Sequence, residues 1–208
     1  DLIDLPKVVE FSREAGAGVM IDDAHGIGVM GEHGRGTPEH FGLEDGVDIL
    51  VGTFSKSFAG LGGFVVGDED TIHYIKHTAR ALMYSASITP GSAAGIIAAL
   101  DIIEKEPERR EQLWKNVAHM KAGYASLGFN TLNSQTPIIP LISGDDITTF
   151  QFWRGLHENG VYTNPVVTPA VPQGQCLIRT SLMATHTTEQ LDRVLEVVEK
   201  VGKDLKII

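Results

Sequence analysis

Amphipathic and apolar stretches alternate along the first half of the chain. Apolar residues recur at helical spacing from Leu5 to Ala15, and Pro6 stands in the first turn, where a helix tolerates it. Three short apolar runs follow, each bounded by glycine or polar residues: Val19–Ile21, Ile49–Val51 and Phe64–Val66. Runs of this length between helices predict strands buried on both faces, in a mixed or parallel sheet covered by helices.

The pattern changes near Glu106, where we place a domain boundary. Helices are expected over 69–82 and 92–104, and Pro107 begins a long helix that runs to about Leu127 and ends at Gly128. The later periodicities predict a strand over 138–142 and a helix over 148–159. Two strands, over 161–164 and 177–182, and a helix over 187–203 are expected to follow. Residues 1–106 are therefore expected to belong to a sheet domain, and 107–208 to form a small α+β domain.

Composition and charge exclude several classes of function. The 17 basic and 27 acidic residues give a net charge of −10, and no Lys/Arg-rich run occurs, so a nucleic-acid-binding face is not expected. The single cysteine, Cys176, excludes an internal disulfide and cannot hold zinc alone, which favours a cytoplasmic protein without a metal site. No stretch reaches the roughly 18 consecutive apolar residues of a spanning helix, so we expect at most peripheral membrane contact.

The residues that carry chemistry follow the first two predicted strands. Asp22 and His25 come after the first strand, and Thr53 and Lys56 come after the second. Because ligands of open α/β sheets bind outside the carboxyl ends of the strands, both segments are expected to face one crevice. A carboxylate, an imidazole and an amine would then meet in one site.

Pyridoxal phosphate requires these three kinds of group. A lysine forms a Schiff base with its aldehyde, and a carboxylate beside the pyridine nitrogen keeps that nitrogen protonated. An imidazole can bind the phenolic oxygen, while hydroxyl groups and glycine amides can hold the phosphate. The combination favours this cofactor.

Each residue taken alone has a simpler interpretation. Asp22 could cap the next helix, His25 could be a structural histidine, and Lys56 could be a solvated lysine or could bind a nucleotide phosphate. The segment around Lys56 lacks the glycines of a phosphate-binding Walker loop, and no G-x-G-x-x-G follows a strand. A nucleotide-binding module is therefore not favoured.

Four segments resemble a known family. In chain order they read DDAHGIGVMGEHGRG, VDILVGTFSKSFAGLGGFVVG, MYSASITP and PAVPQGQCLIRTSLMATHT. They are similar to the α-oxoamine synthases, and the resemblance covers essentially the whole chain. It implies a fold-type I pyridoxal-phosphate transferase of the α/β class. Residues 1–106 would then supply part of the large domain's mixed, mostly parallel sheet, and 107–208 the small C-terminal domain.

The resemblance also implies a role for each matching residue near the cofactor. Asp22 would pair with the pyridine nitrogen, and His25 would hydrogen-bond the phenolic oxygen. Lys56 would form the Schiff base and later remove the α-proton of the substrate. Thr53 would contact the phosphate, and Ser85 would reach the phosphate bound by the neighbouring subunit of a homodimer.

Further residues carry open alternatives. The resemblance implies that Arg179 would receive the amino-acid or product carboxylate, a role suited to its planar donor fork. An arginine buried in a strand without an acidic partner is costly, which favours a ligand at this position over a purely structural role. Ser85 and Ser87 could instead cap the following helix. Asp23 is interpreted as structural, and the run Gly60–Gly63 as a turn that lets the backbone pass close to the lysine loop.

The implied reaction joins an amino acid to an acyl-CoA thioester, with loss of CoA and then CO2. The motifs are most similar to the serine palmitoyltransferase branch, which implies L-serine and palmitoyl-CoA as substrates and 3-ketodihydrosphingosine as product. Glycine C-acetyltransferase (2-amino-3-ketobutyrate CoA ligase) and 8-amino-7-oxononanoate synthase are the alternatives within the family. An aminotransferase on the same fold and a non-catalytic partner subunit are alternatives of other kinds.

The start of the chain predicts a missing segment. The sequence begins without Met and almost within a helix, and its first residues have no signal-peptide pattern. Members of the resembled family are about twice this length, so we expect this chain to be completed by an N-terminal half of the same enzyme. That half would hold the residue that stacks on the cofactor ring.

Overall fold

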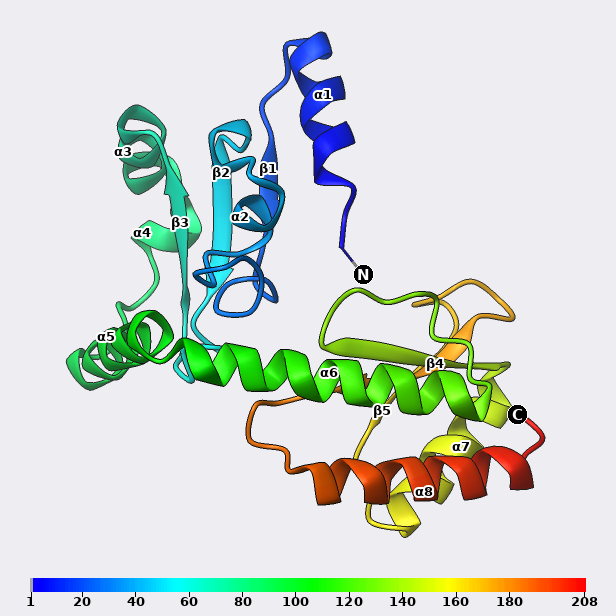
Figure 1. Ribbon diagram of the computed structural model, residues 1–208. Helices are drawn as coiled ribbons and strands as arrows, with labels where there is room; N and C mark the ends of the chain where they lie inside the picture. The colour runs from blue at the N-terminus through cyan, green and yellow to red at the C-terminus, as the bar shows by residue number, and fades with distance from the viewer. Residues whose placement is uncertain (1) are drawn as a thin grey trace. The chain divides into compact units, whose positions relative to one another are not determined.

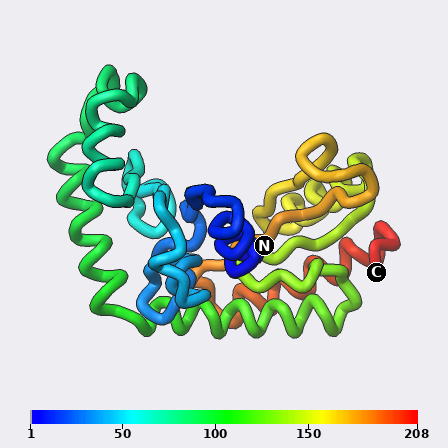
Figure 2. Tube along the Cα trace, turned by 90° about the horizontal axis from the view of Figure 1, so that it is seen from above, coloured from blue at the N-terminus to red at the C-terminus, as the bar shows by residue number. Residues whose placement is uncertain are grey.

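The computed structural model describes residues 2–208, and Asp1 lies outside the described residues. The chain divides into two compact units, Leu2–Arg110 and Glu111–Ile208, which are treated one at a time below. The boundary between Arg110 and Glu111 falls within one helix, Pro107–Leu127. The chain can be traced through both units in Figure 2. Figure 1 labels the elements of both units.

The first unit is built on a three-stranded mixed sheet (Figure 1). Its strands are β1 (Met20–Asp22), β2 (Ile49–Thr53) and β3 (Gly63–Gly67), in the order β1-β2-β3. Strands β1 and β2 run parallel, with Asp22 opposite Val51, and β3 is antiparallel to β2, with Gly63 opposite Thr53. The three predicted strands and the mixed sheet are confirmed.

The prediction that these strands are buried on both faces is wrong for the described residues. Helix α1 (Leu5–Ala15) covers one face, where Leu5 and Val9 pack with Val19 and Ile21 in a small core. On β1 and β3, by contrast, Met20 is 66% exposed and Val66 53% exposed. The described residues therefore supply an apolar layer for only part of the sheet surface.

The remaining helices of the first unit bury little apolar surface. They are α2 (Thr37–Phe41), the 3-10 turn η1 (Glu44–Gly46), α3 (Glu69–Thr78), α4 (Arg80–Met83) and α5 (Pro90–Lys105). The single helix predicted over 69–82 is wrong, because Ala79 adopts an extended conformation, with φ −74° and ψ 98°, and separates α3 from α4. The helix predicted over 92–104 is confirmed and begins two residues earlier, at Pro90.

The second unit is an antiparallel sheet packed by helices. Its elements are α6 (Pro107–Leu127) from Glu111 onward, β4 (Ile138–Gly144), α7 (Asp146–Glu158), β5 (Asn164–Val166), β6 (Cys176–Ser181) and α8 (Thr188–Asp204). The strands lie in the order β4-β6-β5. The predicted order of elements is confirmed. The strand expected over 161–164 is displaced to 164–166, where Pro165 lies on an edge strand that needs no hydrogen bond from its nitrogen.

The core of the second unit is aromatic and aliphatic. Phe129 and Phe152 stack with ring centroids 6.0 Å apart, and Leu156, Ile178 and Val198 are fully buried around them. Helix α8 begins with a capping box made by Thr187 and Gln190. No helix among residues 2–208 is long and apolar enough to cross a membrane.

Candidate functional site

The ends of β1 and β2 bring four candidate residues to one edge of the sheet. Asp22 and Thr53 are the last residues of two adjacent parallel strands. His25 follows Asp22 by three residues, and Lys56 follows Thr53 by the same interval. Parallel strands end at the same edge, so the two segments leave the sheet side by side, where α/β proteins bind their ligands.

The Asp22 carboxylate faces solvent rather than capping a helix. It is exposed, and its Oδ1 accepts a hydrogen bond from the Ala24 amide across 3.0 Å. The interpretation of Asp22 as a cap for the next helix is therefore wrong. The N-cap of α2 is Gly36, and it is the neighbouring Asp23 whose carboxylate accepts from Thr37, the first residue of that helix.

Asp23 anchors the turn that carries His25. Its buried carboxylate accepts hydrogen bonds from the amide and the hydroxyl of Thr37, at 2.7 and 2.6 Å, and so holds the first turn of α2. Burial raises the pKa of Asp23, although the Thr37 hydrogen bonds act in the opposite direction. Side chains at Gly26 or Gly36 would overlap this carboxylate. The structural interpretation of Asp23 agrees with this geometry.

His25 is exposed on the turn that follows. The amides of Gly26 and Ile27 bind the Asp23 carbonyl, at 2.9 and 3.1 Å, and the Gly28 amide binds the Gly34 carbonyl at 2.7 Å. These backbone bonds fix the path of the turn and so the direction from which the imidazole leaves it.

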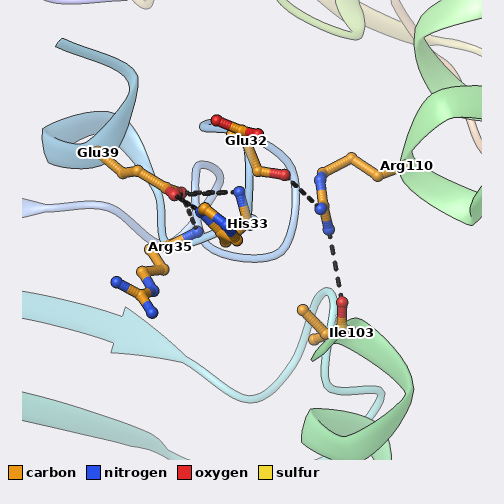
Figure 3. A network of polar contacts seen from close by, with 6 residues as sticks. All are labelled: Glu32, His33, Arg35, Glu39, Ile103 and Arg110. Carbon is orange, nitrogen blue, oxygen red and sulfur yellow. Dashed lines mark hydrogen bonds and ion pairs between the residues drawn. The ribbon is translucent and has the colours of Figure 1, made fainter. Parts of the chain in front are cut away.

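A polar network holds the glycine-rich loop beyond the turn (Figure 3). Glu39 accepts hydrogen bonds from the His33 ring at 2.6 Å, the His33 amide at 3.0 Å and the Arg35 amide at 2.8 Å. Burial acts to raise the pKa of Glu39, but the Arg35 amide and the two His33 contacts outweigh it and lower that pKa. Arg110 donates to the carbonyls of Glu32 and Ile103 and holds the loop from the other side.

The lysine loop connects β2 to β3. The Thr53 hydroxyl donates to the Gly62 carbonyl at 3.2 Å and lies 2.8 Å from the Ser55 hydroxyl. Lys56 is exposed, and its ammonium group makes no hydrogen bond or ion pair with any of residues 2–208. A lysine held on a well-bonded loop without an internal partner is available to a ligand.

The glycines after the lysine bring the backbone close to itself, as predicted. The Gly60 amide binds the Phe54 carbonyl at 2.6 Å. A Cβ atom at Gly63 would lie 2.6 Å from the Gly52 carbonyl oxygen, and Gly62 has a φ of +96°. Bulkier residues would therefore push the loop away from β2.

Ser85 lies in the exposed connection between α4 and α5. Its hydroxyl donates to the Ala81 carbonyl of the preceding helix, and the cap of α5 is Thr89, whose side chain accepts from the Ser92 amide. The interpretation of Ser85 or Ser87 as the cap of the following helix is therefore wrong. Contact of Ser85 with a phosphate in a second subunit remains a prediction.

Arg179 belongs to the second unit and lies in the central strand, β6. It is half-buried, opposite Pro140 of β4 and Asn164 of β5. Its guanidinium group makes no hydrogen bond or ion pair with the residues that the structure describes. An incompletely solvated guanidinium without an acidic partner favours an anionic ligand.

Sequence reasoning did not identify the residues that support the site. Glu39 and Thr37 act through contacts that no short motif encodes.

No group of three or more histidine, cysteine, aspartate or glutamate residues suited to a metal ion occurs within 2–208.

Comparison with known proteins places this arrangement in a family. Residues 1–198 match the family described as Aminotransferase class I and II. The chain belongs to this family, and the resemblance to its α-oxoamine synthase members is confirmed, as is the fold-type I α/β fold.

Particular relatives are similar over the whole chain. A serine palmitoyltransferase of Sphingobacterium spiritivorum is 49% identical, covering 100% of this chain and 52% of the relative. An 8-amino-7-oxononanoate synthase of Treponema denticola is 40% identical, covering 100% and 53%. The solved structure of a serine palmitoyltransferase from S. paucimobilis with bound PLP–myriocin aldimine has a TM-score of 0.95 at 31% identity, covering 100% and 53%. The chain spans about half the length of these relatives.

Proposed function

We propose that the full-length protein carrying this chain uses pyridoxal phosphate to join an amino acid to an acyl-CoA thioester. One observation carries the proposal: the unpartnered Lys56 ammonium follows a strand whose parallel neighbour ends at the exposed Asp22 carboxylate. The similarity to a serine palmitoyltransferase solved with this cofactor supports it.

The residues at this edge fit the cofactor chemically. Asp22 would hold the protonated pyridine nitrogen, and His25 would bind the phenolic oxygen. Thr53 would bind the phosphate, together with Ser85 of a second subunit. When bound, the cofactor supplies an electron sink that stabilises negative charge at the α-carbon of the amino acid.

The protein's own groups would then bind, orient and move a proton. Lys56 would hold the cofactor through Nζ, and the same atom would take the α-proton of the bound amino acid. Arg179 would bind the substrate carboxylate through its planar fork of donors.

L-Serine and palmitoyl-CoA are the substrates we favour, with 3-ketodihydrosphingosine, CoA and CO2 as products. The 49% identity to a serine palmitoyltransferase supports this choice. The second candidate is an 8-amino-7-oxononanoate synthase, which the 40% identity to such an enzyme supports. Glycine C-acetyltransferase is the third candidate, because the segment PVVTPAVPQGQCLIRT resembles that enzyme.

We further propose that the complete enzyme is a homodimer that includes an N-terminal half. The chain spans 52% of its serine palmitoyltransferase relative, which supports a longer protein. Exposed apolar side chains on β1 and β3, such as Met20 and Val66, support a further covering layer.

The proposal is tested with the full-length protein. Purified with pyridoxal phosphate, it is expected to show a visible absorbance band that Lys56→Ala abolishes and that the control Lys76→Ala, on the exposed face of α3, retains. Serine, glycine and alanine are then titrated against this band, and CoA release is measured with palmitoyl-CoA and acetyl-CoA. A spectral response to glycine or alanine but not to serine would remove the substrate we favour.

A further inference from the structure

Ser57, the residue after the candidate lysine, is bonded to the turn that carries His25. Its hydroxyl donates to the Ile27 carbonyl across 2.6 Å. The two residues are 30 positions apart in the sequence, and Ile27 lies two residues beyond His25. One half-buried hydrogen bond therefore joins the lysine loop to the histidine turn.

The backbone of the turn lies close against the Ser57 side chain. A Cβ atom at Gly28 would lie 2.6 Å from the Ser57 Cβ and 2.7 Å from its hydroxyl, so glycine is needed at this contact. Gly28 also has a φ of +81°, a conformation that residues with side chains rarely adopt. The turn and the lysine loop are thus matched in shape as well as hydrogen-bonded.

The other side of the lysine loop is held by packing. The Phe58 side chain is buried, with its ring 5.4 Å from that of Phe54 and 6.1 Å from that of Phe64. Lys56 is thus followed by Ser57, which is hydrogen-bonded to the turn, and by Phe58, which packs into an aromatic cluster. Its own side chain makes no such contact and remains exposed.

We propose that Ser57 is a positioning residue that sets the separation between Lys56 and His25. The proposal rests on the proposed function, because only there do both side chains act on one cofactor. The hydroxyl is already engaged by the Ile27 carbonyl, so it acts through the backbone rather than on the reacting atoms. Small errors in the placement of a catalytic group reduce the rate strongly, by up to about 100-fold for a displacement of about 1 Å.

The first measurement needs no cofactor. Hydrogen–deuterium exchange is followed in the full-length apoprotein for residues 26–30 and 54–60. Loss of one hydrogen bond in Ser57→Ala is expected to speed exchange about 2- to 10-fold in both segments. Ser57→Thr keeps the hydroxyl and is expected to restore slow exchange. The control Ser126→Ala removes a 2.8 Å hydroxyl–carbonyl bond within one helix turn and should leave both segments unchanged.

The second measurement uses protein loaded with pyridoxal phosphate. Ser57→Ala is expected to retain the cofactor, to shift the pH midpoint of its visible band, and to lower kcat about 10- to 100-fold with little change in KM for serine. A loss of stability alone would lower the yield of active protein without moving that midpoint. Ser57→Thr is expected to recover both quantities.

The outcomes separate this proposal from the proposed function. If the wild-type protein binds no pyridoxal phosphate, the proposed function fails, whereas the exchange data still decide whether Ser57 couples the two segments. If the wild type is active and Ser57→Ala changes neither exchange over 26–30 nor the pH midpoint, the positioning role is wrong. Should Ser57→Ala not fold, Ser57→Cys, a weaker donor, is expected to raise exchange in both segments, and unchanged exchange overturns the proposal.

Discussion

Thr37 donates two hydrogen bonds to the buried Asp23 carboxylate, one from its amide at 2.7 Å and one from its hydroxyl at 2.6 Å. The bonds span 14 positions of sequence and tie the residue after β1 to the start of α2. They enclose the turn that carries His25, so the stability of this pair governs the geometry of the candidate site.

Asp23→Asn is predicted to change the pH dependence of stability. Because burial raises the pKa of Asp23, the folded protein holds its proton to a higher pH than the unfolded chain. Stability should therefore fall as the pH rises from the usual carboxyl pKa to the raised one, and then level off. Asn cannot titrate, so thermal unfolding of this variant should lack that decline, whereas the exposed control Asp45→Asn should keep it.

Asp23→Ala separates hydrogen bonding from charge. The variant leaves the Thr37 amide and hydroxyl buried without their acceptor, at a cost of about 1–3 kcal/mol in the free energy of unfolding. Denaturant unfolding of the full-length protein measures this loss. A variant as stable as the wild type would show that the pair does not hold the turn.

Glu39→Gln is predicted to destabilise the protein most near neutral pH, where Glu39 is ionised, and least at acidic pH. The hydrogen bonds that lower the pKa of Glu39 stabilise the fold above the usual carboxyl pKa, and this stabilisation is lost as the pH falls through the lowered value. The variant should unfold at a lower temperature than the wild type near neutral pH, and the difference should shrink on acidification. Glu44→Gln, on the exposed turn η1, is the matched control.

Arg179→Ala is predicted to weaken the binding of amino acids but not that of amines that lack a carboxylate. Loss of a charge-assisted contact with the substrate carboxylate should raise the dissociation constant for serine about 10- to 100-fold. Binding of ethanolamine, which lacks the carboxylate, should change little. Both are followed through the cofactor's visible absorbance, with Arg154→Ala on α7 as control. Equal losses for the two ligands would contradict a carboxylate-binding role.

Phe152→Ala is predicted to cost about 3–5 kcal/mol of stability. The ring is fully buried and stacks on Phe129, so its removal leaves a cavity in the second unit. Phe150→Ala, two residues earlier on α7 and 48% exposed, should cost at most about 0.5 kcal/mol. Comparable losses in denaturant unfolding would show that the core lies elsewhere.

The sequence predicted most elements because their ends carry strong local signals. Pro107 and Gly128 bound α6, and glycine or acidic residues bound the short strands. The break at Ala79 has no such signal, because alanine favours a helix and neither proline nor glycine is near. The predicted burial of the first sheet on both faces is wrong for the described residues, because such burial depends on covering layers that local sequence cannot specify.

The part of the candidate site that lies directly after the ends of β1 and β2 could be predicted from the sequence. Asp22, His25, Thr53 and Lys56 could be placed together because parallel strands end at one edge. The bond from Ser57 to the turn could not, since it joins residues 30 positions apart through a backbone carbonyl that every residue possesses. Support of a site by such bonds depends on the folded path of the chain and carries no local motif.

If Lys56 holds pyridoxal phosphate, the bond between them can be trapped and located. The full-length protein is incubated with the cofactor and treated with borohydride, which fixes any lysine–cofactor C=N bond, and its peptides are then mapped by mass spectrometry. We predict one stoichiometric phosphopyridoxyl label, on Lys56, and we predict that this label is absent when serine has displaced the lysine before reduction. A label on another lysine, or no label on a folded protein, would contradict it.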